Sequence, residues 1–238
     1  MTRALKANSA IIILVLIMVT PLVAGPREDA IDAAQRGDHS SAFRIWRLLA
    51  DQGDASSQNN IGNMYSRGDG VPQDFVEAVK WWRRAADQGF AYAQNSLGFS
   101  YATGTGVTQD LSEAFKWYER AAEQGISEAQ SNLGASYGAG RGVTQDWVAS
   151  TKWYRLAAEQ GNPIGQSNLG VAYANGRGIP RDFVQAYKWY SLAISSFPSA
   201  DSVGRDLALS NRARLAPVMT SSQIAEAQKL AREWMPKP

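Results

Sequence analysis

A set of amide, aromatic and acidic side chains recurs at regular spacing and could bind another molecule. The amides could hydrogen-bond the backbone or terminal carboxylate of a peptide, and aromatic rings are frequent energetic anchors of protein interfaces. These positions differ between the copies of a 36-residue unit, as expected of side chains that have no packing role. The candidate partner-binding residues are Asn59, Asn63, Tyr92, Asn95, Phe99 and Glu128.

Residue types that could carry catalysis are scarce. His39 is the single histidine of the 238 residues and cysteine is absent, so the usual zinc sites cannot form. His39 lies beside Ser40 and Ser41 at a predicted helix start, where we interpret these residues as caps. No Ser-x-x-Lys or Gly-x-Ser-x-Gly motif is present. The sequence therefore predicts a protein that is not an enzyme and needs no cofactor or metal.

Glycine-rich segments such as residues 138–142 resemble phosphate-binding loops only superficially. They lack the Gly-Lys-Ser/Thr ending and follow predicted helices instead of strands. A repeated calcium site is also disfavoured, because the acidic Asp69 is replaced in the other copies. Its equivalents are Thr105, Arg141 and Arg177. We interpret these segments as connections between helices.

The chain is built from a repeated unit. The motif Leu-Gly-x-x-Tyr begins at Leu97, Leu133 and Leu169, in steps of 36 residues. Residues 78–113 and 114–149 are identical at 20 of 36 aligned positions. A period of this length predicts stacked helical units. Each unit would contact mainly its neighbours, so the array forms one elongated domain with a long surface suited to binding.

Each unit is predicted to form two helices. In one copy the first helix is expected over residues 91–103 and the second over 111–124, because apolar residues recur on one face of each. Asp110 should cap the second helix, with Glu113 as the reciprocal partner of a capping box. Gly134 and its equivalents lie inside first helices, where glycine costs about 1 kcal/mol relative to alanine. Their recurrence predicts that the second helix packs closely against them.

Eight tryptophans could indicate a carbohydrate-binding or cofactor surface, but their spacing favours packing. Four of them occupy one repeat position and a fifth occupies another position that is always apolar. We therefore predict that these tryptophans belong to the core. The four are Trp81, Trp117, Trp153 and Trp189, and the fifth is Trp147.

The repeated unit resembles the Sel-one-like repeat, a relative of the tetratricopeptide repeat. The pattern is Ala-x-x-Gln-x-x-Leu-Gly-x-x-Tyr-x-x-Gly-x-Gly-Val-x-x-Asp-x-x-x-Ala-x-x-Trp-Tyr-x-x-Ala-Ala-x-Gln-Gly, which residues 91–125 match throughout. The resemblance covers roughly residues 40–194, and residues 219–234 resemble the helix that closes many bacterial members. It implies an all-α, α/α superhelical solenoid that mediates protein interaction or complex assembly. By the tetratricopeptide pattern, the first helices and the six candidate residues would line its concave groove.

The expected organisation follows from the repeat boundaries. A signal peptide precedes a shortened N-terminal helix pair, four full repeats and C-terminal capping helices. The boundaries are 1–25 for the signal peptide, 26–53 for the shortened pair, 54–89, 90–125, 126–161 and 162–197 for the repeats, and 198–238 for the capping helices.

The first residues have the layout of a secretory signal. Arg3 and Lys6 precede an uncharged apolar run over residues 10–19, and small residues follow at 21–25. The run is shorter than the roughly 20 residues that a membrane span needs. We expect cleavage near residues 24–25 and a periplasmic or secreted protein. An uncleaved anchor, with the solenoid facing the periplasm, is the alternative.

The charge balance indicates that nucleic acid is not the partner. The whole chain has a formal net charge of +2, from 24 basic and 22 acidic residues. Arg3 and Lys6 lie in the predicted signal, so the remainder carries 22 charges of each sign. Proteins that bind nucleic acids usually present a basic face.

These observations together favour an exported, non-enzymatic scaffold that binds a protein or peptide, such as a bacterial periplasmic adaptor or regulator. Two alternatives belong to other classes. A hydrolase of cell-wall or β-lactam substrates would need a nucleophile and base, and no such pair is visible in the sequence. A glycan-binding module would bind isolated cell wall without protein.

Overall fold

The described part of the chain is entirely helical. The computed structural model describes residues 25–237, where it contains twelve α-helices, one short 3-10 helix and no strand. The predicted signal peptide lies, except for Gly25, outside the described residues. Within them, no helix combines the length and the apolar character that crossing a membrane requires. The predicted all-α solenoid is confirmed.

Ten of the helices form five consecutive pairs, each made of a first and a second helix. The pairs are α1 (Pro26–Gln35) with α2 (His39–Asp51), α3 (Ala55–Arg67) with α4 (Phe75–Asp87), α5 (Ala91–Thr103) with α6 (Leu111–Glu123), α7 (Ser127–Ala139) with α8 (Trp147–Glu159), and α9 (Pro163–Asn175) with α10 (Phe183–Ser196). Two further helices follow, α11 (Ser202–Leu215) and α12 (Ser221–Arg232), joined through the 3-10 helix Ala216–Val218.

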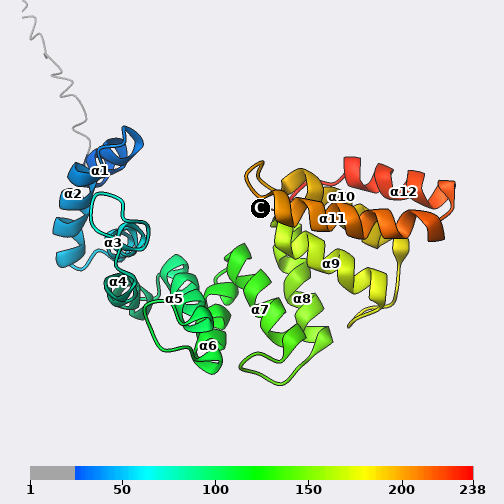
Figure 1. The fold of residues 1–238 in the computed structure, drawn as a ribbon, viewed down its shortest axis with the longest axis horizontal. Coiled ribbons are helices and arrows are strands. Elements are labelled where there is room, and N and C mark those ends of the chain that lie inside the picture. Colours follow the sequence, from blue (N-terminus) through cyan, green and yellow to red (C-terminus); the bar gives the residue numbers. More distant parts are fainter. Residues whose placement is uncertain (1–24, 238) are drawn as a thin grey trace, which may run out of the picture.

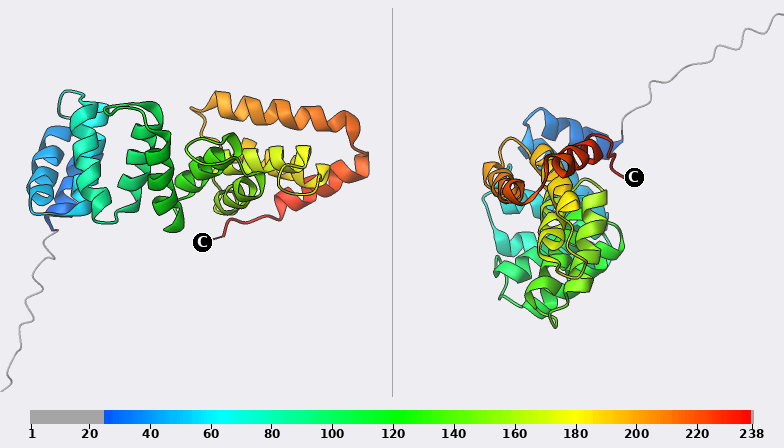
Figure 2. Two further views of the ribbon diagram at one scale, coloured as in Figure 1. Left: turned by 90° about the horizontal axis from the view of Figure 1, so that it is seen from below. Right: turned by 90° about the vertical axis from the view of Figure 1, so that its right-hand side faces the viewer.

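The pairs stack along an arc (Figure 1). Each helix packs mainly against its neighbours in sequence, as in other solenoids. The axes of α1–α6 run across those of α9, α11 and α12 (Figure 2), so the stack also twists along its length. Helices α11 and α12 both pack against α10 and lie on opposite sides of the last pair (Figure 2). The array therefore ends in two helices that cover the last repeat.

The core follows the repeat period. One position of the first helices α3, α5, α7 and α9 is fully buried and holds Ile61, Leu97, Leu133 and Leu169. Burying such a side chain contributes roughly 1.5–3 kcal/mol. Alanines line the facing helices, which lets the backbones approach closely.

Close packing at the mid-helix glycines is confirmed. A Cβ atom added to Gly134 would lie 2.8 Å from Cδ1 of Tyr154 and 3.1 Å from the carbonyl oxygen of Ser150. Real Cβ atoms do not approach other groups so closely, so the second helix leaves no room for a side chain there. Gly170 meets the ring of Tyr190 in the same way.

The recurring tryptophans are largely core residues, as predicted. Trp81, Trp117 and Trp189 are buried, and Trp153 is half-buried. Trp147 differs: it is half-buried and lines a cavity, so the prediction that it is simply core was incomplete.

The helix caps are partly as predicted. The side chain of Asp110 accepts a hydrogen bond from the backbone N–H of Glu113, at 2.9 Å. The reciprocal bond expected from Glu113 does not form, because its carboxylate pairs with Lys116 instead. A complete capping box is present at Thr220 and Gln223.

The expectation that Ser40 and Ser41 cap a helix was wrong. The cap of α2 is Asp38, whose carboxylate accepts from the backbone N–H of Ser41 at 3.0 Å. His39 is the first residue of the helix. Asp is a strong N-cap because its carboxylate oxygen accepts a hydrogen bond from a free backbone N–H, and because its negative charge interacts favourably with the positive end of the helix dipole.

Buried glutamines link consecutive repeats. One glutamine in each first helix from α3 to α9 donates from Nε2 to a carbonyl oxygen of the preceding second helix. In three of the four, Oε1 also accepts from a second glutamine 30 residues later. These pairs are Gln88 to Gln58 (2.8 Å), Gln124 to Gln94 (2.8 Å) and Gln160 to Gln130 (2.9 Å).

The C-terminal segment folds back over the solenoid. The ring of Trp234 meets that of Trp189 edge to face, with centroids 5.9 Å apart. The backbone N–H of Lys237 donates to the carbonyl oxygen of Glu159, and the two side chains form an ion pair at 2.8 Å. These contacts tie the end of the chain to α8 and α10.

Candidate binding site between the repeats

A cavity recurs where a helix pair meets the first helix of the next pair. It is found at three junctions, with volumes of about 340, 230 and 240 Å³ from the N-terminal to the C-terminal one. Their lining residues are equivalent, since they are related by multiples of 36 positions. We call these cavities the inter-repeat pockets.

Six repeat positions line every inter-repeat pocket. The second helix supplies its first residue and an aromatic ring two turns further on. The next first helix supplies an asparagine and the residues three and four positions after it, and the loop after that helix supplies one residue. The Asp69 pocket has His39, Trp46, Asn60, Asn63, Met64 and Asp69; the Arg141 pocket has Leu111, Tyr118, Asn132, Ala135, Ser136 and Arg141; and the Arg177 pocket has Trp147, Tyr154, Asn168, Val171, Ala172 and Arg177.

The backbone fixes the loop residue at the mouth of its pocket. Arg177 lies between two glycines, and its N–H donates to the carbonyl oxygen of Ala172 at 3.0 Å. Gly178 has φ +68°, a conformation that glycine adopts readily. A side chain on Gly178 would also collide with the backbone of Trp147. The loop therefore rests against the start of the preceding second helix and carries its central side chain at a constant place.

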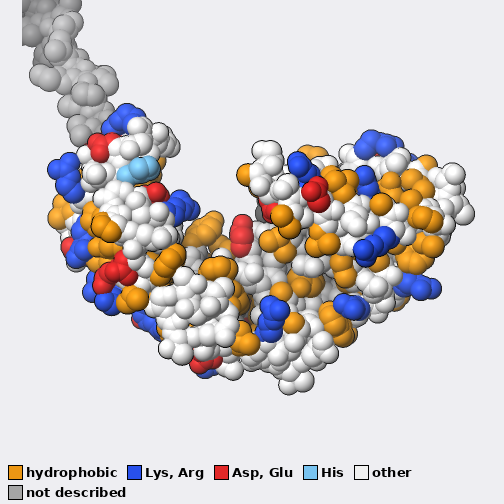
Figure 3. Space-filling view, viewed as in Figure 1, with side chains coloured by type: hydrophobic (Ala, Val, Ile, Leu, Met, Phe, Trp, Pro, Cys, Tyr) orange, Lys and Arg blue, Asp and Glu red, His pale blue; other side chains and the backbone are white. Residues whose placement is uncertain are grey.

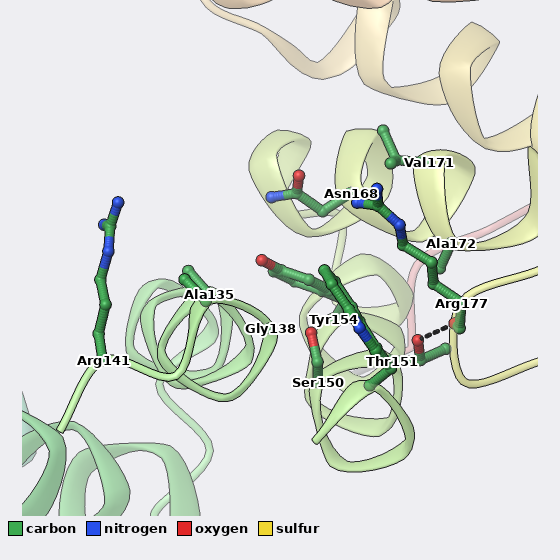
Figure 4. Close-up of a pocket in the computed structure, with 12 residues that line it drawn as sticks. Ala135, Gly138, Arg141, Ser150, Thr151, Tyr154, Asn168, Val171, Ala172 and Arg177 are labelled. Atoms are coloured by element: carbon green, nitrogen blue, oxygen red, sulfur yellow. Dashed lines mark hydrogen bonds between the residues drawn. The ribbon is translucent and has the colours of Figure 1, made fainter. Parts of the chain in front are cut away.

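The Arg177 pocket has polar groups around an aromatic wall (Figure 4). The guanidinium carbon of Arg177 lies 4.5 Å from the ring centroid of Trp147, and Thr151 Oγ1 donates to the Arg177 carbonyl oxygen at 2.8 Å. In Figure 4 the Tyr154 hydroxyl, the Asn168 amide and the Arg177 guanidinium surround one space, and Arg141 extends on the other side. Arg141 lines both this pocket and the preceding one.

The tyrosine at the aromatic position stays neutral. Burial raises the pKa of Tyr154 to about 12, although Ser150 and Arg141 act in the opposite direction. Burial also raises the pKa of Tyr118. These hydroxyls are therefore protonated at neutral pH and can donate a hydrogen bond.

The pockets differ in charge. The first one is lined by both Asp69 and Arg67, whereas the other two carry Arg141 and Arg177 and no acidic residue in their linings. Between residues 25 and 237, no carboxylate lies within ion-pair distance of either arginine. In the same part of the chain, no cluster of three His, Asp or Glu side chains is suited to a metal ion. Figure 3 shows Lys and Arg side chains beside hydrophobic ones over α7–α9.

Of the six residues predicted to bind a partner, three are exposed. Tyr92 and Phe99 are 60% and 54% exposed, and Glu128 is also on the surface. Phe99 occupies the repeat position at which the inter-repeat pockets carry Asn63, Ala135 or Val171. It is the largest side chain at that position, so it changes the shape of the surface at its junction.

The three predicted amides have structural roles, and the expectation that they are free of packing was wrong. Asn59 is only 7% exposed. Asn63 lines the Asp69 pocket, but its Oδ1 accepts from Trp82 Nε1 at 3.0 Å. The Oδ1 of Asn95 accepts from Asn132 Nδ2 at 3.2 Å. The first helices contact neighbours on both sides, so little of their surface is left free.

Sequence analysis missed most pocket residues. Trp147 and Tyr154 look like ordinary core positions in a periodic sequence, because the same rings form both core and pocket wall. A detectable signal was the asparagine that recurs at residues 60, 132 and 168. Such a polar residue in three of four copies marks this repeat position as different from the apolar packing positions.

Comparison with known proteins agrees with this architecture. The Sel1 repeat family matches five consecutive segments, which together span well over half of the chain. The chain belongs to the Sel1 repeat family. The matched segments are residues 32–54, 55–90, 91–126, 127–162 and 163–196. No curated protein sequence matches the chain.

Solved structures show the same Sel1 repeat fold. A Sel1 repeat protein from Oxalobacter formigenes is 28% identical, with 88% of this chain and 85% of that chain covered and a TM-score of 0.70. A protective antigen of uropathogenic Escherichia coli strains is 26% identical over 88% of this chain and 52% of that chain, with a TM-score of 0.55. An immunity protein from Pseudomonas aeruginosa is 14% identical over 90% and 84% of the two chains, with a TM-score of 0.52. This last likeness concerns the fold alone.

Proposed function

We propose that this Sel1 repeat protein is a non-enzymatic scaffold that binds an extended polypeptide segment along its inter-repeat pockets. The observation that carries the proposal is the recurrence of one pocket at three junctions. An extended polypeptide presents side chains at regular intervals, so a periodic row of recesses suits it. Solenoids commonly provide extended binding surfaces of this kind.

The fixed and variable positions of the pockets have separate tasks in this proposal. The asparagines at 60, 132 and 168 offer donors and acceptors that suit any peptide backbone. Asp69, Arg141 and Arg177 occupy one position with different charges, which suits the selection of particular side chains. The exposed rings of Tyr92 and Phe99 add anchors between the Asp69 and Arg141 pockets.

Site-specific photocrosslinking in cells tests this function. A photoreactive residue at Ala135, which is shared by two pockets, should yield adducts with a polypeptide partner that mass spectrometry identifies. The same residue at Val148, which is 68% exposed and lines none of these pockets, is the matched control. Adducts at Val148 but not at Ala135 would place the partner elsewhere.

We also propose that the scaffold acts outside the cytosol. Support comes from Arg3 and Lys6, the apolar run at 10–19 and the small residues that follow. N-terminal sequencing of the exported protein should then begin between residues 25 and 27. Recovery of the full-length chain from the cytosol alone would contradict export.

A further inference from the structure

We propose that the Arg177 pocket is a carboxylate subsite, which receives an Asp or Glu side chain of the bound segment. This inference rests on the proposed function and specifies the chemistry of the segment. It concerns the cavity between α7, α8 and α9.

Two uncompensated cations border this cavity. Arg141 and Arg177 both line it, and neither pairs with a carboxylate in the described part of the chain. Only six basic side chains of this part of the chain have acidic partners, so what distinguishes Arg141 and Arg177 is that both border one cavity whose lining has no carboxylate. The two arginines therefore lack the anion that their charge and five-donor geometry favour.

The Arg177 side chain and the backbone of Arg141 are also held in place. The backbone of Arg177 is fixed by Ala172 and by the hydroxyl of Thr151, and its guanidinium stacks on Trp147. The backbone N–H of Arg141 donates to the carbonyl oxygen of Ser136 at 2.9 Å. Stacking leaves the edge of a guanidinium available for hydrogen bonds, so less side-chain entropy is lost on binding.

Neutral donors complete the site. The Tyr154 hydroxyl and the Asn168 side-chain amide border the same space as Arg177 (Figure 4). The Asn168 side chain makes no hydrogen bond within the described residues, and the only group there that acts on the Tyr154 hydroxyl as a hydrogen-bond partner is Ser150. A carboxylate oxygen would satisfy these donors, and the ring of Tyr154 would cover the methylene groups of the incoming side chain.

A side-chain carboxylate fits better than the terminal carboxylate of a peptide. The pocket is a recess beside the neighbouring Arg141 pocket, with which it shares Ala135 and Arg141. A segment that passes both pockets would place a side chain in each of them. The Asp69 pocket holds a carboxylate beside Arg67, so it would receive an acidic side chain less well than the Arg177 pocket and would favour one direction of the segment.

A peptide-display selection tests the subsite. Random dodecapeptides fused at the N-terminus of a phage coat protein carry no free terminal carboxylate, so any acidic preference must come from side chains. The target is the protein purified after expression of the full sequence. Wild type should select peptides that share an Asp or Glu at one position, and Arg177→Gln should lose this preference. Arg232→Gln removes an equal charge from the exposed end of α12 and should select as wild type does.

Titration of a selected peptide, with both ends blocked, provides the second readout. Replacing its acidic residue by the matching amide should weaken binding to wild type about tenfold, as expected for a hydrogen bond to a charged group. The same change should have little effect on Arg177→Gln, because the two changes remove one interaction. Thermal melts of both variants provide the folding control.

The outcomes separate the two proposals. Peptides that compete for the pockets but share no acidic residue would overturn the carboxylate subsite and leave the proposed function standing. An equal loss of affinity in wild type and Arg177→Gln would do the same. Failure to select any peptide that depends on pocket residues would overturn the proposed function together with the subsite.

Discussion

Ser196 stands where the repeat would place the hydrogen-bond donor to Gln166. Gln160 donates to Gln130 at 2.9 Å, and the equivalent of Gln160 one repeat later is Ser196. The Oε1 of Gln166 is buried and accepts no bond from the described residues. A buried polar atom without a partner costs about 1–3 kcal/mol, so the last repeat lacks a contribution that the glutamine pairs make in the three preceding repeats.

Restoring the missing glutamine should stabilise the protein. We expect Ser196→Gln to raise the free energy of unfolding by about 1 kcal/mol, the usual net contribution of a hydrogen bond. Denaturant titration measures the change. Ser195→Gln, at the exposed neighbouring position, is the matched control. Equal midpoints for Ser196→Gln and wild type would mean that the new amide does not reach Gln166.

Filling the close approach at Gly134 should destabilise the α7–α8 contact. The Cβ of an alanine would lie 2.8 Å from Cδ1 of Tyr154, which outweighs the higher helix propensity of alanine. Gly134→Leu should cost about 1–3 kcal/mol or more through overpacking. Thermal melts measure the loss, and Ala139→Leu at an exposed position of α7 controls for the added side chain. Unchanged melting of Gly134→Leu would contradict the register of α7.

Truncating Phe99 should weaken partner binding without unfolding the protein. This ring is 54% exposed, and loss of an interface anchor can cost about 2 kcal/mol in affinity. Titration with a selected peptide measures the effect, and Val148→Ala on α8 is the control. Asn63→Ala differs from Phe99→Ala, since it also removes the acceptor of Trp82 Nε1 and should lower stability. Full affinity of folded Phe99→Ala would remove this ring from the binding surface.

Alkaline pH should weaken the fold through Tyr154. Burial raises its pKa from 10.0 to about 12, so the folded state keeps a proton that the unfolded chain releases first. The stabilisation is complete below pH ~10 and is lost as pH rises through about 12, a change of about 3 kcal/mol. Unfolding titrations across this range should show a smaller loss for Tyr154→Phe. The exposed Tyr92, changed to Phe, is the control, and identical slopes for wild type and Tyr154→Phe would refute the prediction.

The C-terminal segment should contribute to stability. Trp234 packs against Trp189, and its removal should cost about 2 kcal/mol, less than the roughly 3–5 kcal/mol of a fully buried ring. Denaturant unfolding of Trp234→Ala checks this. Met235→Ala, at a neighbouring exposed position, should match wild type. A Trp234→Ala variant as stable as wild type would show that the segment adds nothing to the solenoid.

The sequence predicts the fold well because packing repeats with the period. Leu133 and Gly134 recur in equivalent form in every full copy, so their burial and close approach follow from the pattern. Caps such as Asp110 are also predictable, since they depend on residues three positions apart. The interaction of Glu113 was not predictable in this way, because its carboxylate pairs with Lys116 instead of accepting the reciprocal bond of a capping box.

The site was less accessible to sequence analysis. Asn59 was placed on a free surface, but it lies buried where a first helix contacts its neighbours. Tyr154 serves both as the wall of a pocket and as the contact of Gly134, so its sequence position reveals only the packing role. The Arg177 pocket is the space left between three helices and two loops. Its size and shape depend on the angles at which the helices cross, and the sequence pattern does not give these angles.

Packing between sequence neighbours has a consequence for how such a chain can change in length. Nearly all helix contacts join adjacent elements, so each junction depends on the two units that form it. Coding stretches as alike as those for residues 91–126 and 127–162 can recombine out of register and gain or lose one unit. The protein encoded after such recombination would keep its terminal helices and the same packing between repeats, while its row of inter-repeat pockets became longer or shorter. Partner length could thus evolve in whole units, without a redesign of the core.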